Sequence, residues 1–81
     1  MMLYSAQIRA TRALLHWSQG DLAKKAGIGI ATVQRVEAGK GLISGHVSTA
    51  FRVQEALNAA GARFISANES GGIGVRLRKR R

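Results

Sequence analysis

The sequence predicts one small, mainly helical domain that ends in a β-hairpin. Three observations support this prediction. Four segments repeat apolar residues at helical spacing, and glycines lie between them. After Gly61 the apolar pattern changes to a period of two. The chain has 81 residues, 46% of them hydrophobic, which suits a single domain with one modest core.

Glycines and capping residues define the helices. The four helices are expected over Ser5–Leu15, Gln19–Ala26, Ile30–Ala38 and Val47–Ala60. In the first helix, Ile8, Leu15 and the small alanines are expected to face inward. Ser18 and Asp21 form a capping-box pattern before the second helix, because the Ser18 hydroxyl can accept from the amide at Asp21. Gly27 then ends that helix in the left-handed region that glycine favours.

Only residues 27–29 separate the second helix from the third, so these two helices form a helix-turn-helix. Val33 and Val36 are expected to face inward in the third helix. The fourth helix has one stripe at helical spacing, made of Ala50, Val53, Leu57 and Ala60. Residues 40–46 are expected to form the loop before it, and Trp17 is expected in the core.

Two short segments near the C-terminus, residues 62–66 and 73–78, alternate apolar and polar side chains and are expected to pair as a hairpin. The apolar side chains that we expect to form a dimer through it are Phe64, Ile73, Val75 and Leu77. A lone hairpin is marginal in water, so it either folds back on the fourth helix or pairs with its twin. We therefore expect three parts: a helix-turn-helix domain (1–61), a dimerisation hairpin (62–78) and a basic tail (79–81).

The charge balance points to a polyanion as the partner. Thirteen Lys and Arg stand against four Asp and Glu, which gives a net charge of +9 at pH 7 and a pI near 11.7. A folding chain with such an excess most often binds nucleic acid. Charge alone leaves a solubilising surface as the alternative. The tail beyond Arg78 is expected to fray and to strengthen binding to all DNA sequences alike.

The residue types present exclude other classes of protein. The chain has no cysteine and only His16 and His46, so disulfides, thiol nucleophiles and a structural zinc site are not expected. No apolar run approaches the ~18 residues of a membrane span. The N-terminus lacks the pattern of a signal peptide, so we expect a cytosolic protein. No carboxylate pair, nucleophile motif or phosphate loop indicates catalysis, and we expect neither an enzyme nor a cofactor.

Two segments resemble a known family. Residues Trp17–Ile28 have the sequence WSQGDLAKKAGI, and residues Ala31–Gly39 have the sequence ATVQRVEAG. They resemble the XRE, or phage-repressor/Cro-type, helix-turn-helix family, for which the Ser-Gln-x-x-Leu-Ala and Glu-x-Gly elements are quite specific. The resemblance covers residues 6–60, and residues 59–65 and 74–78 look like the end of many short bacterial members. It implies a lambda-repressor-like four-helix domain that binds double-stranded DNA.

The resemblance makes the third helix the recognition helix, whose first residues enter the major groove. The positions that it assigns to base contact are Ile30, Ala31, Gln34 and Arg35. Arg35 can pair bidentately with guanine, and Gln34 with adenine. Ile30 and Ala31 depart from the polar residues frequent in the family and can only pack against thymine methyls. This departure leaves open a T-rich half-site or a helix that no longer binds DNA strongly.

The resemblance also implies phosphate contacts and a structural ion pair. Gln19 and Lys40 match positions that contact the DNA backbone, and the Thr32 hydroxyl is expected to contact a phosphate in the same way. A glutamine amide beside the free N–H groups of a helix N-terminus suits a phosphate oxygen. Arg12 and Glu37 match an ion pair that ties the first helix to the end of the third. We expect that pair to stabilise the fold and not to contact a ligand.

Two functions from different classes are compatible with this sequence. We expect a transcriptional regulator of a bacterium or mobile element, a repressor that binds a palindromic operator as a homodimer and blocks polymerase. The alternative is a protein-interaction module, such as an antitoxin or antiactivator, that uses the Ile30–Ala31 surface to bind a protein partner. Salt-dependent binding of duplex DNA distinguishes them.

Overall fold

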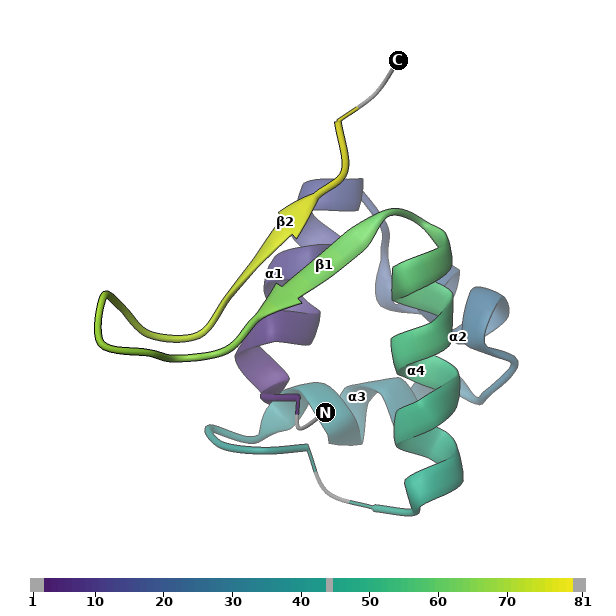
Figure 1. Cartoon of the computed structure of the whole chain (residues 1–81). Helices are drawn as coiled ribbons and strands as arrows, with labels where there is room; N and C mark the ends of the chain where they lie inside the picture. Colours follow the sequence, from purple (N-terminus) through teal and green to yellow (C-terminus); the bar gives the residue numbers. More distant parts are fainter. Residues whose placement is uncertain (1–2, 44, 80–81) are drawn as a thin grey trace.

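Over the residues that the structure describes, the chain forms four helices and one β-hairpin, as the sequence predicts (Figure 1). The computed structural model describes residues 3–43 and 45–79; Ser44 of the expected loop and Arg80 and Arg81 of the tail lie outside these residues. The elements are α1 (Ser5–Leu15), α2 (Gln19–Ala26), α3 (Ile30–Ala38), α4 (Val47–Ala59), β1 (Ala62–Ile65) and β2 (Gly74–Leu77). Among the described residues, no helix has both the length and the apolar character to cross a bilayer.

The ends of the helices follow the capping chemistry of the sequence. The Asp21 amide donates to Ser18 Oγ at 3.0 Å, and the Ser18 amide donates to Asp21 Oδ2 at 2.9 Å. Gly27 ends α2 with φ +70°, a left-handed conformation that glycine adopts without steric strain. The helix α4 is one residue shorter than predicted, since Ala60 caps it and Gly61 turns away with φ +106°. His16 ends α1 at φ +59°, a left-handed position that the sequence did not signal.

One core joins all the elements. Its buried side chains are Ile8, Leu22, Ala23, Ala26, Val33, Val36, Val53, Leu57 and Ala62. These include the inward positions predicted for α2 and α3. Trp17 and Leu15 are half-buried and pack against this cluster. The helical periodicity of the sequence therefore identifies the faces of α2, α3 and α4 correctly.

The prediction for α1 is wrong in one respect. Its alanines, Ala6, Ala10 and Ala13, are exposed. Three polar side chains are buried instead, those of Ser5, Gln7 and Thr11. The Ser5 hydroxyl donates to the Val36 carbonyl at 2.5 Å, and the Thr11 hydroxyl donates to the Gln7 carbonyl at 2.7 Å. Burial of these groups costs little because each one is hydrogen-bonded.

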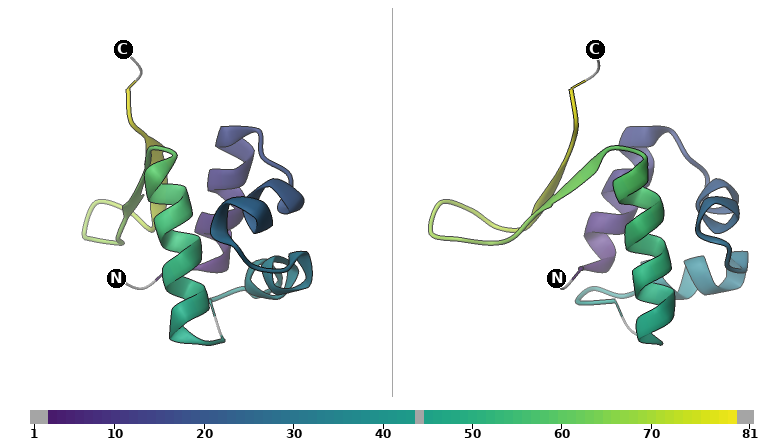
Figure 2. Two further views of the ribbon diagram at one scale, coloured as in Figure 1. Left: turned by 90° about the vertical axis from the view of Figure 1, so that its right-hand side faces the viewer. Right: turned by 45° about the vertical axis from the view of Figure 1, so that its right-hand side comes forward.

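The hairpin lies across α1 and α4 of its own chain, as the views of Figure 2 show. Its strands are antiparallel, with Phe64 opposite Val75 and Arg63 opposite Arg76. The side chains of Phe64, Val75 and Leu77 pack against the core of the same chain. The sequence allows the hairpin either to fold back on the fourth helix or to pair with a second copy. Within the single chain it folds back on the helices.

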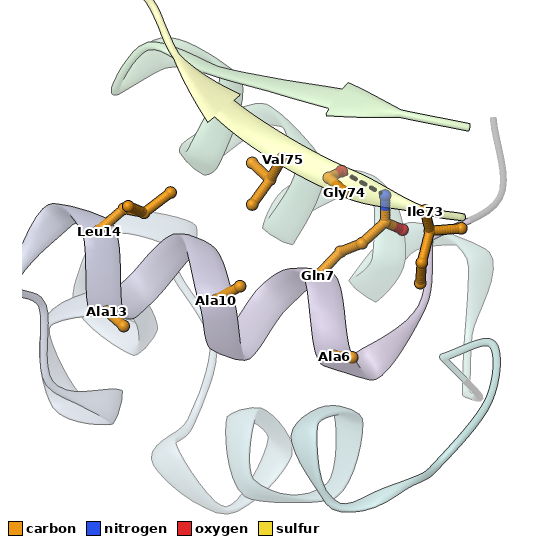
Figure 3. Close-up of a pocket in the computed structure, with 8 residues that line it drawn as sticks. All are labelled: Ala6, Gln7, Ala10, Ala13, Leu14, Ile73, Gly74 and Val75. Carbon is orange, nitrogen blue, oxygen red and sulfur yellow. Dashed lines mark hydrogen bonds between the residues drawn. The ribbon is translucent and has the colours of Figure 1, made fainter. Parts of the chain in front are cut away.

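Gln7 fastens the hairpin to α1. Its Oε1 accepts from the Tyr4 amide at 2.9 Å, which caps the start of the helix. Its Nε2 donates to the carbonyl of Gly74 at 2.9 Å (Figure 3). It also donates to the carbonyl of Ile65 at 3.3 Å. One buried amide group thus provides a hydrogen-bond donor to a backbone carbonyl in each strand, at the end of β1 and at the start of β2.

We predict that Gln7→Met lowers the free energy of unfolding by about 1–3 kcal/mol, because methionine fills similar space but leaves polar backbone groups without their partner. Urea denaturation measures this loss, and amide exchange is expected to show that the hairpin opens before the helices. Gln34→Met, at an exposed position of α3, is the control and is expected within about 0.5 kcal/mol of the parent. A Gln7→Met protein as stable as the parent would contradict this role.

Candidate nucleic-acid interface

A short turn sets α3 against α2. Gly27 leaves α2 in the left-handed region, and Gly29, with φ −76° and ψ 153°, is the extended N-cap of α3. The Arg52 guanidinium on α4 donates to the Gly27 carbonyl at 3.2 Å and so supports the turn from the other side. The result is the helix-turn-helix that the sequence predicts.

The outer side of α3 carries the residues expected to contact bases. Ile30, Ala31, Gln34 and Arg35 are all exposed, whereas the inner side of the helix is buried. Ile30 is a large apolar side chain that is 51% exposed. This side of α3 therefore combines an apolar patch at the start of the helix with amide and guanidinium groups one turn later. That composition can make both apolar and hydrogen-bonded contacts with base edges.

Thr32 contacts Arg35 across one turn of α3. Its Oγ1 accepts from Arg35 Nη2 at 3.0 Å, so the hydroxyl expected at a phosphate is engaged with the neighbouring guanidinium. Both residues line a shallow groove of about 340 Å³ that Gly45, His46 and Thr49 close from the side of α4. The contact restricts the rotamers of a long side chain, and restriction before binding reduces the entropy that binding costs.

A three-member network joins α1, α2 and α3. Arg12 Nε donates to Glu37 Oε2 at 2.6 Å, and Arg12 Nη2 donates to Glu37 Oε1 at 2.9 Å. Gln19 Nε2 donates to the same Oε1 at 3.1 Å. The structure thus brings together the ion pair implied by the family resemblance and the glutamine expected at a phosphate. Only one N–H of the Gln19 amide is used in this contact, so the other can still donate to a ligand.

The Glu37 carboxylate is charged in the folded protein despite its burial. Glu37 is 3% exposed, and this burial by itself raises the pKa of its carboxyl group. Hydrogen bonds from Arg12 and Gln19 outweigh burial, so the pKa of Glu37 lies below its ordinary value. The hydrogen bond to Glu37 in turn raises the pKa of Arg12. The pair therefore adds no net charge to this part of the domain.

Sequence reasoning missed two residues of α1 that hold the end of α3. Ser5 Oγ donates to the Val36 carbonyl, and Arg9 Nη1 donates to the carbonyls of Glu37 and Gly39. These bonds satisfy carbonyl groups that a helix C-terminus leaves free. The signal was present in the spacing, because residues 5, 9 and 12 lie on one side of a helix.

Lys40 lies exposed in the segment that follows α3. This segment is attached to the start of α1: the Ser5 amide donates to the Gly41 carbonyl at 2.9 Å, and the Ile43 amide donates to the Leu3 carbonyl at 2.9 Å. The backbone around Lys40 is thus held in place, while its ammonium group remains accessible to a phosphate.

We predict that the Glu37 network makes stability depend on pH in the acid range. A folded-state pKa below the unfolded one contributes stability that is present above the unfolded pKa, about 4.3, and is lost as the pH falls through the folded pKa. Glu37→Gln removes this contribution, and breaking such a buried pair costs about 3–5 kcal/mol. The difference between parent and variant is expected to be largest above pH ~5 and to shrink below pH ~4.

Urea denaturation across a pH series measures that difference. Glu55→Gln removes an exposed carboxylate of α4 and serves as the control, which is expected to stay close to the parent across the series. A difference between parent and Glu37→Gln that is the same at pH 3 and at pH 7 would show that the charge of Glu37 is not what stabilises the fold.

Comparison with known proteins agrees with this geometry. A family model described as helix-turn-helix matches residues 8–58, which span the described interface and most of the helical domain. Comparison with curated proteins finds no match.

Proposed function

Since the chain belongs to the XRE-type helix-turn-helix family of DNA-binding proteins, we propose that it is a transcriptional repressor that inserts α3 into the major groove of operator DNA. The observation that favours this function most is the exposed outer side of α3, where Arg35 is already restrained by Thr32. Repression follows from occupancy, because a protein bound across a promoter excludes polymerase from it.

Each exposed residue of α3 has a role in this proposal. Arg35 pairs with O6 and N7 of a guanine, and Gln34 pairs with N6 and N7 of an adenine. Ile30 and Ala31 pack against thymine methyl groups, so the half-site contains thymine where the start of the helix meets the bases. Thr32 acts on base recognition through Arg35 and is a positioning residue.

Contacts with the phosphate backbone of the DNA fix the position of α3 along the duplex. Gln19 donates its free amide hydrogen to a phosphate at the start of α2, where the helix dipole also favours an anion. Lys40 neutralises a second phosphate near the end of α3. Lys79 and the basic residues that follow it in the sequence add DNA contacts that do not depend on base sequence and that do not fix the position of α3.

We predict that Arg35→Ala weakens binding to the preferred duplex by about 1–3 kcal/mol for each half-site and relaxes the preference at one base pair. Thr32→Val keeps the shape of the side chain but removes the acceptor, and it is expected to cost about 0.5–1.5 kcal/mol at the same base pair. Selection of random duplexes followed by titration measures both effects. An Arg35→Ala protein that binds the selected duplex as tightly as the parent would show that Arg35 does not contact a base.

We also propose that the protein acts as a homodimer on a palindromic operator, with half-sites about 34 Å apart. An open, mainly apolar groove of about 560 Å³ between α1 and β2 supports a contact with a second copy (Figure 3). The residues that line it are Ala6, Gln7, Ala10, Ala13, Leu14, Ile73, Gly74 and Val75. Two of the residues expected at the dimer interface, Ile73 and Val75, line the groove. Val75 also packs against the core of its own chain, as Phe64 and Leu77 do. A two-fold axis there would give both copies the same patch.

We predict that Leu14→Glu makes the protein monomeric without unfolding it, because Leu14 is 46% exposed at the groove and a carboxylate there cannot be buried against a second copy. Sedimentation equilibrium measures the change. Val47→Glu is the control, since Val47 is 86% exposed on α4, away from the groove lining. Dissociation by Val47→Glu and not by Leu14→Glu would assign the interface to α4.

A second candidate function rests on one observation, the exposure of Ile30. A large apolar side chain beside Ala31 at the tip of α3 suits a protein surface as well as a thymine methyl. In that case the chain is an antitoxin or antiactivator that binds a protein partner. Binding of selected duplexes that weakens steeply with salt supports the repressor, and binding of no duplex supports the protein-interaction module.

A further inference from the structure

The outward face of the hairpin concentrates positive charge that no described residue neutralises. Arg63 on β1 is directly opposite Arg76 on β2. Both side chains are exposed, and with Leu77, Arg78 and Lys79 they line a shallow groove of about 340 Å³. Within residues 3–43 and 45–79, neither Arg63 nor Arg76 forms an ion pair or a side-chain hydrogen bond. This set, Arg63, Arg76, Arg78 and Lys79, is called the hairpin basic face.

The pleat of the strands determines which way these arginines point. Phe64 and Val75 form the neighbouring cross-strand pair, and both pack against the core. Successive side chains of a strand point to opposite faces, so Arg63 and Arg76 point away from the helices. The hairpin basic face is therefore a surface of the folded domain and not a property of the tail alone.

The Arg63–Arg76 pair is unfavourable in the isolated protein. Residues directly opposite in an antiparallel pair have Cα atoms about 4.5–5.5 Å apart, and like charges at this position destabilise a sheet. An anion bound between the two guanidinium groups reverses this repulsion. Each guanidinium offers a planar fork of donors that matches a phosphate, and two adjacent forks match successive phosphates of a nucleic-acid backbone.

The composition of this face favours duplex DNA over single-stranded nucleic acid. Proteins that bind single strands stack bases on exposed aromatic side chains. The strand residues that alternate onto the outward face are Arg63, Ile65, Gly74 and Arg76, none of which is aromatic. Contacts from this face are therefore made to the backbone and do not depend on base sequence.

The hairpin basic face and the outer side of α3 belong to different ends of the molecule. Figures 1 and 2 show α3 at one end and the strands at the other, where they lead to the C-terminus. The principal extents of the fold are 36 × 32 × 18 Å. A duplex that lies along α3 is thus separated from the hairpin basic face by α1 and α4, on which the hairpin packs.

We propose that the hairpin basic face binds the phosphate backbone of a second segment of duplex DNA, so that one protein can hold two segments at once. This inference rests on the proposed function, in which α3 binds the first duplex. Arg63 and Arg76 make the central phosphate contacts, and Arg78 and Lys79 extend them toward the C-terminus.

The test measures whether the protein bridges two duplexes. A duplex selected on the parent protein is immobilised and saturated with protein, and a fluorescent duplex that lacks the selected site is then added. The parent is expected to capture the fluorescent duplex, and the double variant Arg63→Gln/Arg76→Gln is expected to capture at least about tenfold less. Its affinity for the immobilised duplex is expected to stay within about twofold of the parent. Lys24→Gln/Lys25→Gln removes two exposed charges from α2 and is expected to capture like the parent.

Several results would overturn the proposal. One is equal capture by the parent and by Arg63→Gln/Arg76→Gln. Another is a loss of affinity of Arg63→Gln/Arg76→Gln for the immobilised duplex, in which the slope of log affinity against log salt concentration becomes shallower by about 0.9 for each lost phosphate contact. That result would put the hairpin on the same duplex as α3. Capture of single-stranded RNA or polyglutamate in preference to the second duplex would assign this face to a different partner.

Two controls separate the possible failures. The melting temperature of Arg63→Gln/Arg76→Gln is expected to equal or exceed that of the parent, because the variant relieves a like-charge pair; a lower value would contradict the repulsion on which the proposal rests. A parent protein that binds no immobilised duplex contradicts the proposed function and this inference together. Tight binding of the first duplex with no capture of the second contradicts this inference alone.

Discussion

The buried carboxylate of Glu37 constrains the position of α3. The helix α3 has nine residues, too few to be stable alone in water. Its last turn is held from α1 by three side chains: Arg12 pairs with the carboxylate, and Ser5 and Arg9 donate to carbonyls at the end of the helix. Hydrogen bonds to charged groups are stronger and more directional than apolar contacts. They fix the rotation of α3, which apolar packing of Val33 and Val36 alone would leave less sharply defined.

The same helix α1 also positions the hairpin. Gln7 donates to both strands, and Thr11, one turn later, is buried with its hydroxyl on the Gln7 carbonyl. Thus α1 holds α3 through residues 5, 9 and 12 and holds the hairpin through residue 7. The alanines between these anchors are exposed at the groove beside β2, where small side chains leave space. The polar residues of α1 therefore determine how the two proposed DNA-binding surfaces are oriented relative to each other.

Much of the fold could be predicted from sequence, because the signals are local. Periodicity identified the helices, and the first three have the predicted bounds. The prediction failed on the inward side of α1, since burial of Gln7 depends on partners 58 and 67 residues away, in a hairpin whose placement periodicity does not specify. A short polar side chain can be buried once a distant acceptor is available, whereas an alanine has little apolar area to bury.

For the candidate site, the sequence predicts which side chains are exposed but not which contacts they form. Exposure of residues 30, 31, 34 and 35 follows from helix geometry once Val33 and Val36 face inward. The family resemblance then assigns these positions to base contact, and that assignment stays a prediction. The Thr32–Arg35 hydrogen bond joins neighbours three positions apart, so its possibility lies in the sequence, but its formation depends on the rotamer of a long side chain.

The net charge of +9 overstates the charge available to a polyanion. Arg12 is paired with Glu37, which cancels its charge. The exposed guanidinium groups of Arg9 and Arg52 keep their charge, but their bonds to backbone carbonyls hold them in place on the fold. The other basic side chains of the described residues are exposed: Lys24, Lys25, Arg35, Lys40, Arg63, Arg76, Arg78 and Lys79. They divide between the helix-turn-helix and the hairpin. Because the salt dependence of DNA binding counts phosphates neutralised at the interface, a single duplex on α3 is expected to release far fewer counterions than the total charge implies.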